Sequence, residues 1–173
     1  MLFRKPTAEL RAGADVRRAM RGDVARLVEL WTRLMNGHAE MDPRFALTPD
    51  APQQMSRRFQ SLLQDRDALI LVSETAGDVV GFGVGHLDAN LSFFRGPIIG
   101  FISDVYVLEE YRRQGRAARL VNTLRGWFIQ NRASSIQLHA AACNPGAHAF
   151  WRSMGFTDFL IRMWLDLEPG GSG

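Results

Sequence analysis

The chain carries at residues 112–117 the stretch Arg112-Arg113-Gln114-Gly115-Arg116-Ala117, and this turn decides the fold. An apolar run typical of a strand precedes it at residues 98–107, and a periodic segment typical of a helix follows at residues 118–129. A glycine at such a junction lets the backbone turn tightly and approach a ligand closely. The first N–H groups of the helix lack intrahelical partners, and the helix dipole adds positive charge there. The turn therefore predicts a cradle for a phosphate or pyrophosphate, with arginines alongside.

Around this turn, strand-like and helix-like segments alternate in an order typical of a mixed α+β protein. Asp23 is a plausible N-cap for a first helix, and Asp50 for a second that runs to Gln64. A further helix is expected at residues 147–154, ended by Gly155. Strands are expected at residues 15–20, 68–73, 79–87, 98–107, 136–141 and 159–167.

The bulk composition is that of one ordinary globular domain. The 173 residues are 46% hydrophobic and 23% charged, and we expect a domain at residues 15–167 between a mobile lead (1–14) and a flexible tail (168–173). No apolar run approaches the roughly 20 residues of a membrane span, and the single cysteine allows no intrachain disulfide, so we expect a cytoplasmic protein. The excess of arginine is scattered rather than gathered into a continuous basic face, which argues against nucleic-acid binding.

Two other phosphate-binding motifs do not fit the turn. A P-loop needs Gly-Lys-Ser/Thr, and a dinucleotide fingerprint needs three glycines before a helix. The glycine cluster Gly81-Phe82-Gly83-Val84-Gly85 lies inside an alternating strand with no helix after it. We interpret these glycines as sites of close backbone approach or of a bulge.

Two stretches resemble the signatures of the GNAT superfamily of acetyl-CoA-dependent N-acetyltransferases. Residues 104–117, Asp-Val-Tyr-Val-Leu-Glu-Glu-Tyr-Arg-Arg-Gln-Gly-Arg-Ala, resemble its acetyl-CoA signature, Arg/Gln-x-x-Gly-x-Gly/Ala. Residues 144–156, Asn-Pro-Gly-Ala-His-Ala-Phe-Trp-Arg-Ser-Met-Gly-Phe, resemble the second: an asparagine, a helix with aromatic residues, then Gly-Phe. The resemblance implies a central, mostly antiparallel sheet of about six to seven strands flanked by four helices. It also implies transfer of an acetyl group from acetyl-CoA directly to a primary amine of a small molecule or protein N-terminus.

The resemblance also implies roles for the matching residues. A strand that splays from its neighbour would offer backbone groups to the pantetheine arm, the turn would hold the pyrophosphate through backbone N–H groups, and an asparagine would bind the pantetheine region. The implied cofactor-binding residues are Val105, Tyr106, Val107, Arg112, Arg113, Gln114, Gly115, Arg116, Ala117, Ala118, Asn144 and Trp151.

Transfer to an amine requires a proton acceptor, because an alkyl amine is almost wholly protonated at neutral pH. His139 is the first candidate, since it stands five positions before Asn144, where some family members carry a glutamate base. A histidine has a suitable intrinsic pKa, although it could equally be hydrogen-bonded within the sheet. Asp104 is the second candidate base. His86 is a weaker third candidate.

The acceptor side is less marked in the sequence. We expect residues 37–50 and 91–97 to shape it, with His38, His86 and Trp31 as candidate contacts, although Trp31 at helical spacing is more often a core residue. No zinc-type ligand spacing is present, so no metal is expected. Homodimerisation is an expectation from the family alone.

One position departs from the family pattern. Many members place a tyrosine seven positions after the asparagine as the general acid, and this chain has Trp151, which cannot act as an acid at neutral pH. The departing coenzyme A would then leave as a thiolate or take a proton through water. The same substitution motivates an alternative function, a GNAT-type module that binds acyl-CoA without turnover as a sensor.

Overall fold

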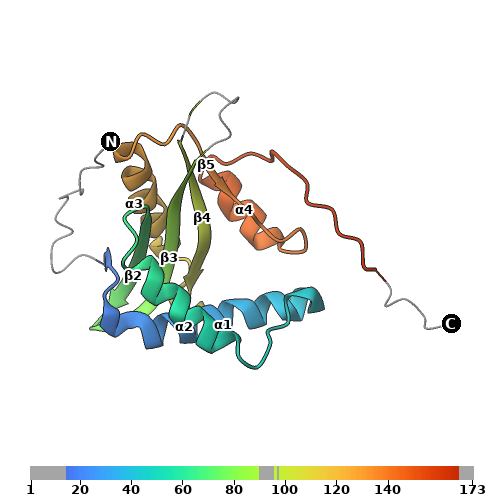
Figure 1. Ribbon diagram of the computed structural model, residues 1–173, viewed down its shortest axis with the longest axis horizontal. Helices are drawn as coiled ribbons and strands as arrows, with labels where there is room; N and C mark the ends of the chain where they lie inside the picture. Colours follow the sequence, from blue (N-terminus) through green and yellow to red (C-terminus); the bar gives the residue numbers. More distant parts are fainter. Residues whose placement is uncertain (1–14, 90–95, 97, 168–173) are drawn as a thin grey trace.

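A computed structural model describes residues 15–89, 96 and 98–167 (Figure 1). The expected lead (1–14), the expected tail (168–173) and all of residues 91–97 except Gly96 lie outside the described residues. The elements, in chain order, are β1 (Val16–Arg18), η1 (Arg21–Asp23), α1 (Val24–Met41), η2 (Pro43–Phe45), α2 (Ala51–Leu62), β2 (Ala68–Thr75), β3 (Asp78–Ala89), β4 (Ile98–Val107), η3 (Glu109–Tyr111), α3 (Arg116–Gln130), β5 (Ile136–Leu138) and α4 (Pro145–Ser153).

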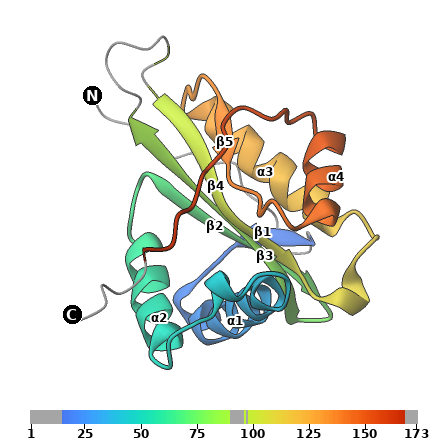
Figure 2. The same ribbon diagram turned by 90° about the vertical axis from the view of Figure 1, so that its right-hand side faces the viewer.

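The described strands form one mixed sheet in the order β1-β2-β3-β4-β5. The pairs β1–β2, β2–β3 and β3–β4 are antiparallel, whereas β4 and β5 run parallel. Helices α1 and α2 cover one face of the sheet, and α3 and α4 cover the other (Figure 2). This arrangement confirms the predicted α+β class with four helices flanking a mostly antiparallel sheet.

Each face of the sheet packs its own apolar cluster. On the α1/α2 face, Phe59 from α2 meets Phe82 from β3 edge to face, with ring centroids 6.1 Å apart. On the α3/α4 face, Leu120, Leu124 and Phe128 from α3 are fully buried against β2 and β4. Two buried faces explain why β2 reads as a continuous apolar run rather than as an alternating one.

The glycines of β3 and β4 confirm the interpretation of close backbone approach. A Cβ added at Gly81 would lie 2.8 Å from the Tyr106 carbonyl oxygen, and one added at Gly85 would lie 2.8 Å from the Phe128 ring. At Gly100 the distance to that ring would be only 2.5 Å. Gly85 and Gly100 therefore allow the Phe128 ring of α3 to pack directly against the backbone of the sheet.

The C-terminal part of the sheet differs from the expectation. Residues 159–167 form no strand and are exposed, and β5 ends at Leu138 rather than at residue 141, so the described sheet has five strands instead of six to seven. An alternating sequence makes a segment suitable for pairing, but pairing also needs a neighbouring edge at the right place. No helix in the described ranges is long and apolar enough to cross a membrane.

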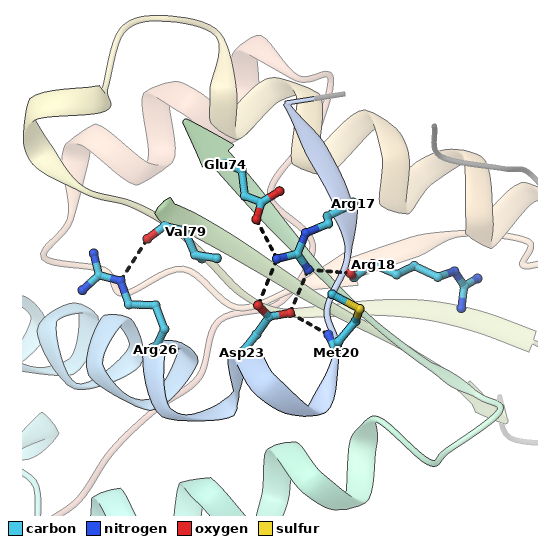
Figure 3. Close-up of polar contacts among 7 residues, drawn as sticks. All are labelled: Arg17, Arg18, Met20, Asp23, Arg26, Glu74 and Val79. Carbon is cyan, nitrogen blue, oxygen red and sulfur yellow. Dashed lines mark hydrogen bonds and ion pairs between the residues drawn. The ribbon is translucent and has the colours of Figure 1, made fainter. Parts of the chain in front are cut away.

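A buried ion-pair network ties the start of the chain to the sheet (Figure 3). Arg17 donates from both Nη atoms to the Asp23 carboxylate, at 2.8 and 2.9 Å, and from Nη2 to Glu74 Oε1 at 2.7 Å. The Met20 N–H also donates to Asp23, at 2.6 Å. Asp23 therefore serves as the N-cap residue of α1 by position, but its side chain bonds back to β1 and to the preceding turn instead of capping the helix.

We expect Asp23→Asn to lower the free energy of unfolding by about 2 kcal/mol, because a charged hydrogen-bonding group contributes about that much. The bidentate bond from Arg17 lowers the pKa of Asp23, so its contribution is present above the ordinary aspartate pKa and is lost as the pH falls through the lowered one. Urea unfolding at pH 7 and pH 3 measures both effects. Glu29→Gln, which removes the surface ion pairs of Glu29 with Arg26 and Arg33, is the matched control and should change stability by less than about 1 kcal/mol.

Candidate functional site

The turn before α3 presents a row of backbone N–H groups. Arg113 and Gly115 both adopt left-handed backbone conformations, with φ of 62° and 75°. The Arg112 N–H donates to Glu109 O, and the Arg119 N–H donates to Gly115 O. Between these two, the N–H groups of residues 113–118 donate to no acceptor in the part of the chain that the structure describes. Exposed N–H groups in a turn at the start of a 15-residue helix suit an anion.

The arginines of this turn have different positions. Arg116 is buried and donates to Ser73 Oγ at 3.2 Å and to Glu74 O at 3.1 Å, so its side chain fastens the turn to β2. Arg112 donates to Val107 O at 3.0 Å and lies over the Tyr106 ring at 5.7 Å. Arg119 donates to Gln114 O at 3.2 Å, close beside Gly115. Exposed positive charge at the turn therefore comes from Arg112, Arg113 and Arg119.

Strand β4 loses its parallel neighbour where the predicted pantetheine-binding residues begin. Its pairing with β5 covers only Gly100, Phe101 and Ile102, opposite Ile136–Leu138. Residues 103–107 pair with β3 alone, so one edge of β4 is open in the described structure. An open edge of this kind can accept an extended ligand as if it were a further strand.

Helix α4 begins next to this open edge of the sheet. The Asn144 side chain accepts from the Ala147 N–H at 2.9 Å and so caps α4, leaving its NH₂ group available to donate. Trp151 packs between Phe150 and Phe156, with ring centroids 5.0 and 5.3 Å away, within the apolar cluster of the α3/α4 face. Trp151 therefore makes apolar ring contacts at the position seven residues after Asn144, where the resemblance leads us to expect a tyrosine.

A bulge in β4 directs Asp104 to the α1/α2 face. Val84 of β3 lies opposite Asp104, but the next residue, Gly85, lies opposite Ile102, so Ser103 is an extra residue in β4. Without the bulge, Asp104 would share the face of Ile102, which packs against α3. With it, Asp104 shares the face of Tyr106, toward α1 and α2.

Charged groups from three other elements act on Asp104. Burial raises the pKa of this carboxyl, and the Ser103 side chain together with Arg58 (α2), His38 (α1) and His86 (β3) opposes that rise. Burial in turn lowers the pKa of His38, with Asp104 acting in the opposite direction. His38 Nδ1 is buried without a hydrogen-bond partner among the described residues. Asp104 is therefore a carboxylate of increased basicity within electrostatic reach of His38, an imidazole that burial makes less basic.

The other candidate base lies apart from this group. His139 is exposed and follows directly after β5, with its ring centroid 5.1 Å from that of Phe101. His86 meets the same Phe101 ring at 5.3 Å and its Nε2 lies 3.4 Å from Asp88 Oδ2. Phe101 thus contacts both histidines, and His139 is not among the groups that perturb Asp104. His38 and His86 therefore lie within electrostatic reach of Asp104, whereas His139 is not among the groups that act on Asp104.

Two further residues bear on the site. Trp31 packs against the apolar cluster of the α1/α2 face, in keeping with a core position. Arg58 was not expected from the sequence, because one arginine on an amphipathic helix gives no signal of what it faces. Arg119 follows Gly115 by four residues, and residues four apart on a helix lie on the same side. This spacing could have predicted that Arg119 lies beside the turn.

Three known proteins are similar to this chain in sequence or in fold. An uncharacterised N-acetyltransferase of Archaeoglobus fulgidus is 27% identical over 161 residues, which cover 92% of this chain and 98% of the relative. An aminoglycoside N(6')-acetyltransferase type 1 of Stenotrophomonas maltophilia is 25% identical over 129 residues, covering 73% and 84% of the two chains. A tetramutant protein of Bacillus halodurans, solved by crystallography, shares the fold with a TM-score of 0.79 at 22% identity, covering 88% and 99% of the two chains.

The sequence profile of the acetyltransferase (GNAT) family matches residues 30–156. That range includes the cradle, the bulged strand β4 with Asp104, and the whole of the second signature at residues 144–156. The chain is therefore a member of the GNAT family of acetyltransferases.

Proposed function

We propose that this enzyme transfers an acetyl group from acetyl-CoA directly to a primary amine, with both substrates bound at once. The observation that carries the proposal is that the backbone cradle of residues 113–118 and the carboxylate of Asp104 are joined by one strand with an open edge. The first is suited to the pyrophosphate of the donor, and the second to the proton of the acceptor.

The donor would lie along β4. Backbone N–H groups of residues 113–118 would hold the pyrophosphate, with Arg112, Arg113 and Arg119 adding charge. The open edge at residues 103–107 would bind the pantetheine arm, and the NH₂ group of Asn144 is free to donate to it. Arg112 and Arg119 already contact Glu109 and Asp15, at 3.9 and 3.3 Å, whereas the backbone N–H groups of residues 113–118 and the Asn144 NH₂ group have no partner among the described residues. These free donors are the groups that support acetyl-CoA as the donor.

In the proposed transfer, Asp104 takes the proton that the acceptor ammonium must lose. The neutral amine nitrogen then forms a bond to the acetyl carbonyl carbon, the bond from that carbon to sulfur breaks, and the nitrogen gives up its second proton to water as the amide forms. His38, neutral and with its Nδ1 free, is placed to relay the proton. Trp151 supplies no acid, so coenzyme A leaves as a thiolate or takes a proton through water.

The acceptor is proposed as a small molecule with a primary amine, or a protein N-terminus, because the Stenotrophomonas relative is named for acetylation of an aminoglycoside amine. Thiol release from acetyl-CoA should be followed with a panel of aminoglycosides, polyamines, amino acids and N-terminal peptides. We expect turnover with at least one class, confirmed by the mass of the acetylated product. Thermal stabilisation by acetyl-CoA without turnover on any acceptor would favour the sensor alternative instead.

A further inference from the structure

A free guanidinium lies close to the proposed base. Arg58 of α2 is exposed and has no hydrogen bond or ion pair within the described ranges. Its charge nevertheless acts on the Asp104 carboxyl of β4, so the two groups lie within electrostatic reach of each other. A guanidinium without a partner can bind a carboxylate through two parallel hydrogen bonds. Arg58 is therefore available to bind an anion near the place where acetyl transfer is proposed.

Helical spacing places Arg58 at the border of the apolar face of α2. Met55, three residues before it, and Leu62, four residues after it, both belong to the apolar cluster of the α1/α2 face. Residues three and four apart lie on the same side of a helix, so Arg58 stands at the margin of that cluster. Arg57 lies on the solvent side, because its neighbours three and four residues away are all polar: Gln53, Gln54, Gln60 and Ser61.

The charges around Asp104 suit an acceptor with groups of both signs. The bulge in β4 turns Asp104 to the face of the sheet that α1 and α2 cover (Figure 2). The charged groups that act on it most strongly are Arg58, His38 and His86, and all three lower its pKa. One carboxylate in this setting complements one ammonium group of the acceptor, while the Arg58 guanidinium complements an anion on the same molecule.

An acceptor with several ammonium groups fits this charge pattern poorly. Two other carboxylates on neighbouring elements already have partners: Asp42 accepts from Arg44 Nε at 2.9 Å, and Asp88 Oδ2 lies 3.4 Å from His86 Nε2. A second ammonium group beside Arg58 would meet a charge of its own sign, and the repulsion grows as water is excluded. A carboxylate at the same place would instead gain charge-assisted hydrogen bonds.

We propose that Arg58 binds a carboxylate of the acceptor, so that the enzyme acetylates amines that also carry a carboxylate group. The ammonium group of such a molecule would face Asp104, and its carboxylate would face Arg58. This inference rests on the proposed acetyl transfer and narrows its acceptors from primary amines in general to zwitterionic amines. The exposed position of Arg58 places the carboxylate end of the acceptor toward solvent, at the edge of α2.

Matched pairs of acceptors test the proposal. Each pair is an amino acid and its amide, such as leucine and leucinamide, or β-alanine and β-alaninamide, with kanamycin as the polycation. Calorimetric titration in the presence of coenzyme A measures affinity, and thiol release from acetyl-CoA measures turnover. We expect at least one amino acid to bind more tightly than its amide. Arg58→Gln should weaken binding of that amino acid by roughly 10- to 100-fold, the loss of a charge-assisted hydrogen bond, and leave the amide unchanged.

Arg57→Gln is the matched control, because it removes the neighbouring charge from the solvent side of the same helix. It should preserve the preference for the amino acid. Arg58 also acts on Asp104, and the pairs separate the two roles. An effect through the base would lower kcat for both members of a pair, whereas loss of a carboxylate contact raises KM for the amino acid alone.

Three results would overturn the proposal. They are equal affinity for both members of every pair, a preference that survives in Arg58→Gln, and a loss of acetyl-CoA affinity in Arg58→Gln, which would assign Arg58 to the donor. Tighter binding of kanamycin than of any amino acid would count against it equally. If an amino acid binds with the expected dependence on Arg58 and no acceptor is turned over, the carboxylate site stands and the proposed acetyl transfer fails.

Discussion

Asp104→Asn is expected to lower kcat for acetyl transfer by about 10²–10⁴-fold, the usual contribution of a positioned general base. The amide keeps the size of the side chain but cannot take a proton. Binding of acetyl-CoA should be unchanged, because the cradle at residues 113–118 lies beyond the end of β4, in the turn before α3 and the first turn of that helix. Steady-state kinetics with saturating acetyl-CoA measures kcat, and the thermal shift produced by acetyl-CoA measures binding.

The pH dependence gives a second readout of the same residue. Burial raises the pKa of Asp104, and the base works only when ionised, so kcat/KM of the native enzyme should rise with pH through that raised pKa. In Asp104→Asn, the residual kcat/KM should no longer fall as the pH drops through the raised pKa of Asp104.

Stability should change in the opposite direction to activity. A raised carboxyl pKa means that the folded state binds the proton more tightly than the unfolded chain, so this residue favours folding at low pH and costs stability as the pH rises through the raised pKa. At pH 7 the native protein keeps a partly buried charge, and the amide removes it. We expect Asp104→Asn to raise the melting temperature by about 2–4 °C, equivalent to about 1 kcal/mol.

Two further variants test whether the effect on kcat is specific to Asp104. Asp78→Asn removes a charge from the exposed β2–β3 turn and should leave kcat within about twofold of the native value, since surface substitutions have small effects. His139→Ala addresses the rival base. If His139→Ala lowered kcat more than Asp104→Asn does, the assignment of the base to Asp104 would be wrong.

Local sequence rules predicted most of the fold. The 3.6-residue periodicity placed α1, α2 and α3, and the turn at Ala76 and Gly77, both with positive φ, separated β2 from β3 as expected. The rules failed at residues 159–167, whose alternation is real but whose partner edge is not specified by the segment itself. Whether a strand pairs within its chain or elsewhere depends on tertiary position, which a local pattern does not contain.

The candidate site was predictable in its donor half and not in its acceptor half. The cradle is made of backbone groups in consecutive residues, so a contiguous motif reveals it. The face of the sheet on which Asp104 lies depends on Ser103, an extra residue that shifts the register of β4 against β3. This shift cannot be recognised until the strand pairing is known. The groups that act on Asp104 come from α1, α2 and β3, which are far apart in the sequence. His139 ranked first only because its distance from Asn144 could be counted.

Gly115→Val is expected to weaken acetyl-CoA binding by about 10²-fold while leaving the fold intact. Gly115 has a φ of 75°, and a β-branched residue is strained there. The space itself is open, because an added Cβ would come no closer than 3.4 Å, to Arg119 Nη1. The cost therefore arises from the backbone, which relaxes away from the left-handed conformation and turns the N–H groups of the cradle out of alignment. Losing charge-assisted hydrogen bonds worth roughly 1.5–3 kcal/mol accounts for the fold-change.

The kinetic signature and a graded series make this test specific to the cradle. KM for acetyl-CoA should rise about 10²-fold with kcat little changed, since Asp104 is untouched, and isothermal calorimetry should show the same loss of affinity. Gly115→Asn should fall between Gly115→Val and the native protein, because asparagine tolerates the left-handed conformation. Gly126→Val, in the same helix with nothing within 4 Å of the added Cβ, is the matched control and should bind normally. Undiminished affinity in Gly115→Val would show that acetyl-CoA does not depend on these N–H groups, and the cradle would then be only the start of a helix.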